Sequence, residues 1–273
     1  MTKCYIFAKI YNSIGRGGKT VNVFEAVGHF VILCLQAVGT AVLLIWETIC
    51  QLKHLNWRHV IFQMAHLGVD SLPIVSLTLF FAGAVMTLQI ANILVSYGAQ
   101  STVGGIIAIS MGRELGPVLV GVVLSGRVGA AITAELGTMK VTEQIDALRV
   151  MAVNPVGYLV VPRVVACMIM VPILAFYGVM LGILGGYIVA VFVQGLLGAA
   201  FLDSIQMLAV TTDLTYGLLK ACIFGGVIAL VGAYKGMTTG EGAAAVGNST
   251  TSSVVTSIIL VFVLNYFLSS ILF

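Results

Sequence analysis

The sequence predicts an all-α integral membrane protein with an N-terminal interfacial helix and five transmembrane helices. Of its 273 residues, 60% are hydrophobic and only 8% are charged, whereas a soluble domain has about 25% charged residues. Its apolar runs are unbroken over the roughly 20 residues that a spanning helix needs, and they lack the alternation of a β-barrel strand. The net charge of +3 is spread along the chain, so we expect no nucleic-acid partner.

The first 60 residues are more polar than the rest. Residues 1–20 are basic and contain no acid, and we expect this segment in the cytoplasm. Its Ser13–Thr20 stretch nearly matches a phosphate-binding loop, but no α/β domain surrounds it, so we interpret it as a basic segment near anionic lipid. Residues 21–60 are the expected interfacial helix region, because polar residues interrupt the apolar run and Trp46 and Trp57 suit a membrane boundary.

The five spans are expected within residues 61–273. The first has Asp70 or Ser71 as its N-cap and Pro73 in its first turn, and its apolar run ends at Val95. The second runs from Val103 to about Gly126, with a kink at Pro117, and its helix continues past Arg127. The uncharged run 164–202 exceeds one span, so we expect a loop or re-entrant piece near Gln194-Gly195. The last two spans are about 214–234 and 252–273.

Small residues recur every four positions in the second span, which predicts close helix packing in lipid. One row comprises Gly121, Ser125, Gly129, Thr133 and Gly137, and a parallel row comprises Gly126, Ala130 and Ala134.

The positions of Lys and Arg predict the orientation. Of 13 such residues, Arg113 and Lys220 lie inside spans, and the other 11 fall in the N-terminal region, in segment 127–163 or at Lys235. The positive-inside rule then places the N-terminus and segment 127–163 in the cytoplasm. Five spans follow if residues 21–50 do not cross, and the C-terminus then faces outward.

Three charged residues and one amide lie within the spans: Arg113, Glu114, Lys220 and Asn265. A charge near the bilayer centre is costly, so such residues usually face a cavity or a partner. They could form a polar lining that contacts a ligand headgroup. Alternatively, pairs such as Glu114 with Lys220 could only lock the bundle. The sequence leaves both interpretations open.

The segment from about 138 to 153 is charged and follows the second span. Ile145, Leu148 and Ala152 share one helical face, and Thr142 could cap the helix. This pattern predicts either a docking helix for a soluble ATPase or a surface helix resting on the membrane.

No catalytic set is visible in the sequence. It has no HExxH motif, no paired carboxylates and no nucleophile with a base, and its five cysteines have no metal-ligand spacing. We therefore expect that residues 1–273 form a single domain that is not an enzyme and binds no cofactor itself.

The run RELGPVLVGVVLSGRVGAAITAELGTMKVTEQIDALRVMAVNP, residues 113–155, closely resembles the MlaE/YrbE permeases, the membrane subunits of MCE-associated ABC lipid transporters. The resemblance implies a homodimer around a lipid cavity, with a periplasmic MCE-domain protein and, in some systems, a STAS-domain protein. It implies that phospholipid is moved by ATP hydrolysis, with ATP and Mg bound by a separate ABC subunit. The resemblance makes Glu143, Gln144, Ile145, Asp146 and Leu148 the coupling helix, and it places Arg113, Glu114 and Lys220 near the cavity. Asn265 replaces an acid that some members carry.

Two other functions remain possible from the sequence alone. A proton-coupled secondary transporter could use Glu114 and Lys220 as a relay, although no inverted repeat is visible. An intramembrane lipid enzyme would need a catalytic set that the sequence lacks.

Overall fold

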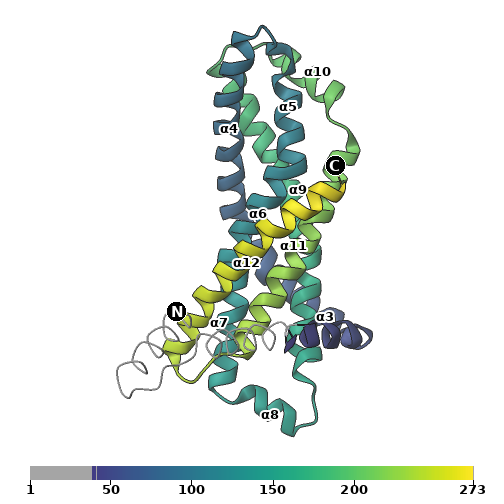
Figure 1. The fold of residues 1–273 in the computed structure, drawn as a ribbon, viewed down its shortest axis with the longest axis vertical. Coiled ribbons are helices and arrows are strands. Elements are labelled where there is room, and N and C mark those ends of the chain that lie inside the picture. The colour runs from purple at the N-terminus through teal and green to yellow at the C-terminus, as the bar shows by residue number, and fades with distance from the viewer. Residues whose placement is uncertain (1–38, 41, 273) are drawn as a thin grey trace, which may run out of the picture.

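The computed structural model describes residues 39, 40 and 42–272, and the regular structure in that part of the chain is helical throughout (Figure 1). Five helical stretches are long and apolar enough to span a membrane, which confirms the predicted all-α membrane class. The segment 1–20 and the interfacial region up to residue 38 lie outside the described residues. The five stretches are Trp57–Ser96, Gln100–Val141, Val156–Phe192, Thr211–Met237 and Ala243–Leu272.

The first stretch contains α3 (Trp57–Gly68) and α4 (Leu72–Ser96), joined by the short turn η2 (Val69–Ser71). Pro73 lies in the first turn of α4, as predicted. Ser71 occupies the N-cap position of α4, as predicted, but its side chain makes no capping hydrogen bond, because the chain before α4 is already helical. The Ser71 hydroxyl donates instead to the Leu67 carbonyl at 2.6 Å.

The second stretch is one continuous helix that contains two π-helical turns. Its parts are α5 (Val103–Ser110), η4 (Met111–Leu115), α6 (Gly116–Leu124), η5 (Ser125–Gly129) and α7 (Ala130–Val141). The helix passes Arg127 without a break, as expected. Pro117 is the second residue after the first π turn, and π turns of this kind are frequent at functional sites.

The helix α8 (Gln144–Val150) follows α7 and lies at the lower end of the molecule in Figure 1. The chain then re-enters the bundle through η6 (Val156–Val160) and α9 (Val161–Phe192). At the opposite end, Gly195 has a positive φ of 67°, where the sequence predicted a loop. The rest of that loop differs from expectation, because residues Gly198–Leu208 form the helix α10. The α10 hydroxyl of Ser204 accepts a hydrogen bond from Gly105 N at the start of α5.

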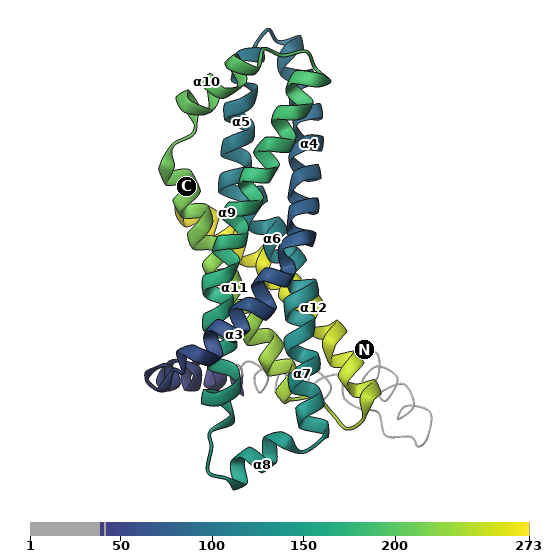
Figure 2. The ribbon, with the colours of Figure 1, turned by 180° about the vertical axis from the view of Figure 1, so that it is seen from behind.

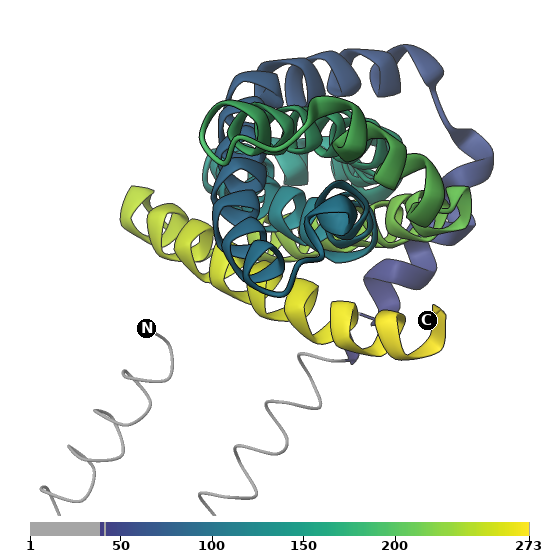
Figure 3. The same cartoon turned by 90° about the horizontal axis from the view of Figure 1, so that it is seen from above.

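The last two helices are α11 (Thr211–Met237) and α12 (Ala243–Leu272). The predicted fifth span began at residue 252, but α12 starts nine residues earlier, since Ala243–Ala245 favour a helix. Figures 1 and 3 show α12 crossing obliquely along the outside of the bundle formed by the other helices.

Glycines set how closely the helices approach. The predicted row from Gly121 to Gly137 is buried, and Val261 of α12 packs against Gly121. The second predicted row is wrong at Gly126, which is exposed and would have no neighbour within 4 Å of an added Cβ. One very close approach is between α4 and α9, because a Cβ on Gly83 would collide with the Gly182 carbonyl.

A short apolar helix, Val42–Gln51, lies crosswise to the long axis of the bundle (Figure 2). Trp46 and Ile49 are exposed on it, as expected for a helix in the membrane interface. Its Glu47 carboxylate accepts a hydrogen bond from the Asn154 side chain at 2.9 Å. This part of the interfacial region is therefore attached to the connection after α8.

Candidate functional site

A polar cluster lies between η4, α11 and α12, within the spans. The Lys220 Nζ lies 2.7 Å from Glu114 Oε1 and 2.8 Å from Ser269 Oγ. Asn265 Nδ2 donates to Glu114 Oε2 at 2.9 Å, so both carboxylate oxygens have partners. Lys220 is fully buried, whereas the Glu114 side chain is 38% exposed. The structure thus brings together three of the four residues predicted for the cavity.

The sequence around Glu114 explains why Lys220 belongs here. Pro117 has no N–H to donate to the Arg113 carbonyl four residues earlier, where an ordinary helix would make a hydrogen bond. That carbonyl instead accepts a hydrogen bond from Lys220 Nζ at 3.2 Å. A backbone group left without a partner in the membrane costs several kcal/mol. Lys220 therefore satisfies both a carboxylate and a backbone carbonyl.

Arg113, the fourth predicted residue, forms a second ion pair with a partner that sequence reasoning missed. Its Nε and NH2 groups lie 2.8 and 2.7 Å from Asp213 Oδ1. Asp213 and Lys220 lie seven residues apart on α11 and hence on the same face, whereas Arg113 and Glu114 are neighbours on η4. The seven-residue spacing of Asp213 and Lys220 is the sequence signal that could have identified Asp213. Gly112 and Gly217 let the two backbones approach, since a Cβ on Gly217 would collide with the Gly112 carbonyl.

The charges of this cluster cancel: two cations face two carboxylates. The bundle therefore holds four ionised groups within the spans in two pairs, as membrane proteins commonly do. Glu114 and Arg113 are each more than a third exposed, so the cluster is not sealed inside the bundle. Chemically, it can offer hydrogen bonds to a polar group without requiring that group to carry a net charge.

A second charged network lies nearer the α8 end and was also missed in the sequence. Arg163, almost fully buried, pairs with Glu135 at 2.9 Å, and His66 lies 3.5 Å from the other oxygen of Glu135. His66 also lies 3.4 Å from Asp70, which Arg127 approaches to 3.7 Å. These contacts connect α3 with α7 and α9, the two helices that flank α8.

The predicted coupling residues form α8, but its N-terminus differs from expectation. Glu143 is the N-cap, with a left-handed φ of 61°, and Gln144 begins the helix. The predicted cap, Thr142, instead ends α7, where its hydroxyl donates to the Thr138 carbonyl. Asp146 lies 3.2 Å from Lys140 of α7 and 2.9 Å from Arg149 of α8. The contact with Lys140 holds α8 against the end of α7.

The apolar face of α8 is split. Ile145 is buried and Leu148 is half-buried, but Ala152 lies beyond the helix end, is exposed and has a φ of 58°. The predicted shared face therefore holds for Ile145 and Leu148 only. Val150 is 88% exposed, and Met151 beside it is exposed too. These two apolar side chains form a surface that the charge pattern did not predict.

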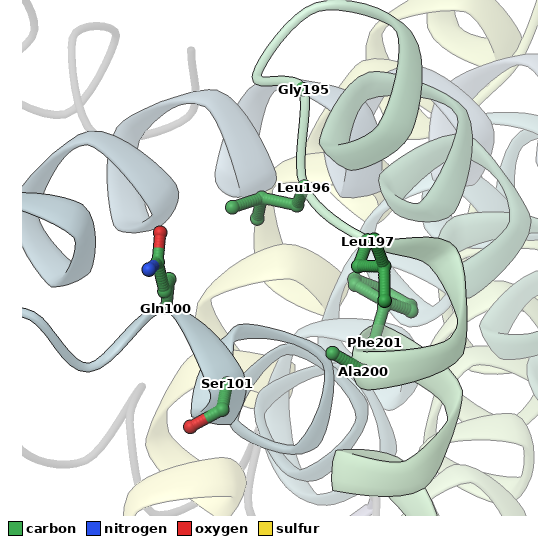
Figure 4. A pocket seen from close by; sticks show the side chains of 7 residues that line it. All are labelled: Gln100, Ser101, Gly195, Leu196, Leu197, Ala200 and Phe201. Atoms are coloured by element: carbon green, nitrogen blue, oxygen red, sulfur yellow. The ribbon is translucent and has the colours of Figure 1, made fainter.

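Two pockets formed by described residues lie outside the polar cluster. One of about 380 Å³ lies at the α10 end, between the turn before α5 and the connection from α9 to α10, and its lining has no ionisable side chain (Figure 4). The other, of about 250 Å³, lies between the Val42–Gln51 helix and the connection after α8, and its lining includes Glu47, Arg149 and Asn154. Within the described ranges, no group of three or more His, Cys, Asp and Glu side chains could hold a metal ion.

Comparison with known proteins gives one consistent result. The sequence profile of the family described as Permease MlaE matches residues 60–271. A probable ABC transporter permease protein of Rickettsia conorii is 39% identical, covering 97% of this chain and 98% of its own length. One from Synechocystis is 43% identical over 80% of this chain and 83% of its own. The chloroplastic protein TRIGALACTOSYLDIACYLGLYCEROL 1 of Arabidopsis thaliana is 35% identical, over 80% of this chain and 63% of its own.

Proposed function

Since this chain belongs to the MlaE permease family, as a non-enzymatic membrane subunit of an ABC transporter, we propose that its cargo is a lipid. The cargo is a phospholipid or a similar amphiphile, moved between the membrane and a periplasmic MCE-domain partner. An ATP-binding subunit, which holds ATP and Mg, supplies the energy.

The observation that carries this proposal is the half-exposed polar cluster of Glu114, Lys220, Asn265 and Ser269 within an apolar bundle. An amphiphile needs a polar contact for its headgroup and apolar surroundings for its chains, and this cluster offers both. The Arabidopsis relative, which bears the name of a lipid, supports the same class of cargo. The two ion pairs also give Glu114 and Lys220 a bundle-locking role, which is compatible with headgroup contact.

We place the ATP-binding subunit on α8. The exposed Val150 and Met151 are apolar side chains at the tip of a helix connecting two spans, where a partner can bury them. Glu143, Gln144 and Asp146 lie on the same short helix and would form the polar rim of that contact. The α8 end then faces the cytoplasm, and the C-terminus of α12 faces the periplasm of a bacterial inner membrane. A second copy of the chain completes a homodimer, and a STAS-domain protein accompanies the ATPase in some systems.

Reconstitution tests the function. The chain, its ATP-binding subunit and its MCE partner are placed in vesicles that contain tail-labelled phosphatidylcholine. We expect ATP-dependent transfer of the label between these vesicles and protein-free vesicles, in one direction. Transfer that requires a pH gradient and no ATP would contradict the proposal and favour a proton-coupled transporter.

Docking is tested with Val150→Asp. This change leaves the internal contacts of Ile145 and Asp146 intact, yet it places a charge in the proposed interface. We expect the ATP-binding subunit to co-purify with the wild type. Its affinity for the variant should be at least about tenfold lower, so that it no longer co-purifies. Tyr97→Asp, at an equally exposed apolar residue of the opposite end, is the control and should keep the subunit. Equal retention by both variants would show that α8 is not the docking helix.

A further inference from the structure

The face of α12 that meets the bundle is a polar stripe. Ser253, Ser257, Val261, Asn265 and Ser269 follow one another at intervals of four residues, so they share one side of the helix. The first three are fully buried, and the last two contact Glu114. The opposite side carries large exposed apolar residues, among them Val255, Ile259, Phe262, Tyr266 and Phe267.

Part of this stripe lacks hydrogen-bond partners. Among the described residues, nothing bonds to the hydroxyls of Ser253 and Ser257 or to Asn265 Oδ1, although all three atoms are buried. Other hydroxyls of α12 behave differently: Thr250 and Thr256 donate to carbonyls four residues earlier, at 2.8 and 2.7 Å. An unsatisfied polar atom destabilises a buried contact, and alanine would avoid that cost. The packing of α12 in this structure alone therefore does not explain why serine occupies positions 253 and 257.

The helix is also the least buried of the five described spans. Three residues of α12 are buried, against twelve in α11, a helix of similar length. Small groups line the contact, because a Cβ on Gly129 would lie 3.9 Å from Ser257 Oγ and one on Gly121 would lie 3.1 Å from Val261. At its C-terminal half, α12 is held by the hydrogen bonds of Asn265 and Ser269 to Glu114.

We propose that the stripe Ser253, Ser257, Asn265 and Ser269 is a track for the polar headgroup of the transported lipid when α12 separates from α6, α7 and α11. This inference rests on the proposed lipid transport. The unsatisfied hydroxyls then donate to headgroup oxygens, while the acyl chains stay against the apolar side of α12. The track begins beside the Glu114–Lys220 pair and leads along α12 toward the α8 end.

The same residues specify the class of headgroup. The stripe has no charge, and the four ionised groups next to it, Arg113, Glu114, Asp213 and Lys220, sum to zero. A headgroup with a net negative charge would meet the Glu114 carboxylate without a net positive field to offset it. The track therefore accepts a headgroup that is rich in hydrogen-bonding oxygens and has no net charge.

The double variant Ser253→Ala, Ser257→Ala separates a track from a structural role. Because the hydroxyls of Ser253 and Ser257 have no hydrogen-bond partner in this structure, their removal should leave the thermal unfolding midpoint unchanged or raise it. In the vesicle assay of the complete complex, transfer of tail-labelled phosphatidylcholine should fall about tenfold, as expected for two lost hydrogen bonds. The matched control is Ser252→Ala, Thr256→Ala, whose positions are also four apart on α12 but off the stripe, and it should transfer at the wild-type rate.

The outcomes are distinguishable. If the wild-type complex transfers lipid and the double variant does so equally fast, the track is wrong and the proposed function stands. If the double variant loses transfer together with thermal stability, the serines are structural and the track is again wrong. If the wild-type complex transfers no lipid, the proposed function fails first. Phosphatidylglycerol with the same acyl chains should be transferred about tenfold more slowly than phosphatidylcholine. Equal transfer rates would contradict the inference that the track selects a headgroup without net charge.

A second measurement does not depend on transfer. In a variant without the native cysteines, Ser257→Cys should react slowly with a thiol reagent, because the position is buried. Adding the ATP-binding subunit with ATP should increase its reaction rate about tenfold or more if α12 separates. Ile259→Cys, exposed on the other side of α12, should react at one rate in both conditions. An unchanged rate at Ser257→Cys would overturn the proposal.

Discussion

At the scale of single residues, ion pairs within the spans explain how charged side chains persist in an apolar helix bundle. Glu114 and Lys220 are 106 residues apart in the sequence, yet their charged atoms lie 2.7 Å apart. Each pair joins η4 to α11, and Glu114 also reaches α12 through Asn265 and Ser269. One carboxylate therefore holds three segments of the bundle together.

Lys220→Met tests this arrangement. It leaves the Glu114 carboxylate without its cation and the Arg113 carbonyl without its donor, so we expect a loss of about 3 kcal/mol in the free energy of unfolding. Glu114→Gln with Lys220→Met should recover part of that loss, because no charge is then left uncompensated. Thermal unfolding in detergent measures all the variants, together with Glu114→Gln alone. Additive losses in the double variant would show that the pair is not coupled.

At the scale of helices, glycine decides which pairs come close. Helices α4 and α9 approach at Gly83 and Gly182, and α11 approaches η4 at Gly217 and Gly112. A bilayer gives apolar helices no hydrophobic drive to associate, so close van der Waals contact is a main source of their affinity. The polar network of His66, Glu135 and Arg163 adds a second link, between α3 and the helices that flank α8.

Gly83→Ala should therefore destabilise the protein, by about 1–3 kcal/mol, because the added methyl group collides with the backbone of α9. Gly126→Ala is the matched control: it adds the same methyl group in a helix, where nothing lies within 4 Å. Alanine favours a helix over glycine, so this control should be neutral or stabilising by up to about 1 kcal/mol. Equal unfolding midpoints for the two variants would rule out close packing at Gly83.

At the scale of the whole molecule, the two ends differ in charge. The α8 end carries Lys140, Arg149 and the Arg163–Glu135 network, whereas the segments 96–102 and 195–213 of the α10 end contain no Lys or Arg. This asymmetry underlies the proposed orientation, with α8 in the cytoplasm beside the ATPase and α10 toward the MCE partner.

Cysteine labelling of intact cells checks the orientation. In a variant without native cysteines, Ser101→Cys at the α10 end should react with a membrane-impermeant maleimide that has entered the periplasm. Ala147→Cys on α8 should react only after the inner membrane is permeabilised. Both positions are exposed, so burial does not limit either reaction. The reverse pattern would invert the proposed topology.

The sequence by itself determined the membrane class, the number of spans and four of the polar residues within them. Long apolar runs are a local property, and a charge inside such a run must find a partner, so Arg113, Glu114, Lys220 and Asn265 could be selected without coordinates. Helix ends were less accessible, as Thr142 and Ser71 show, because a hydroxyl can bond either to an N-terminal amide or to the carbonyl four residues before it.

Only the tertiary structure decided the partners. That Arg113 pairs with Asp213 depends on how α11 lies against η4, and that Ser253 and Ser257 face inward depends on the path of α12 across the bundle. Such contacts join residues a hundred or more positions apart, and helical periodicity relates only neighbours along one helix. The sequence therefore specified which side chains needed partners, and the packing of helices determined which partners they found.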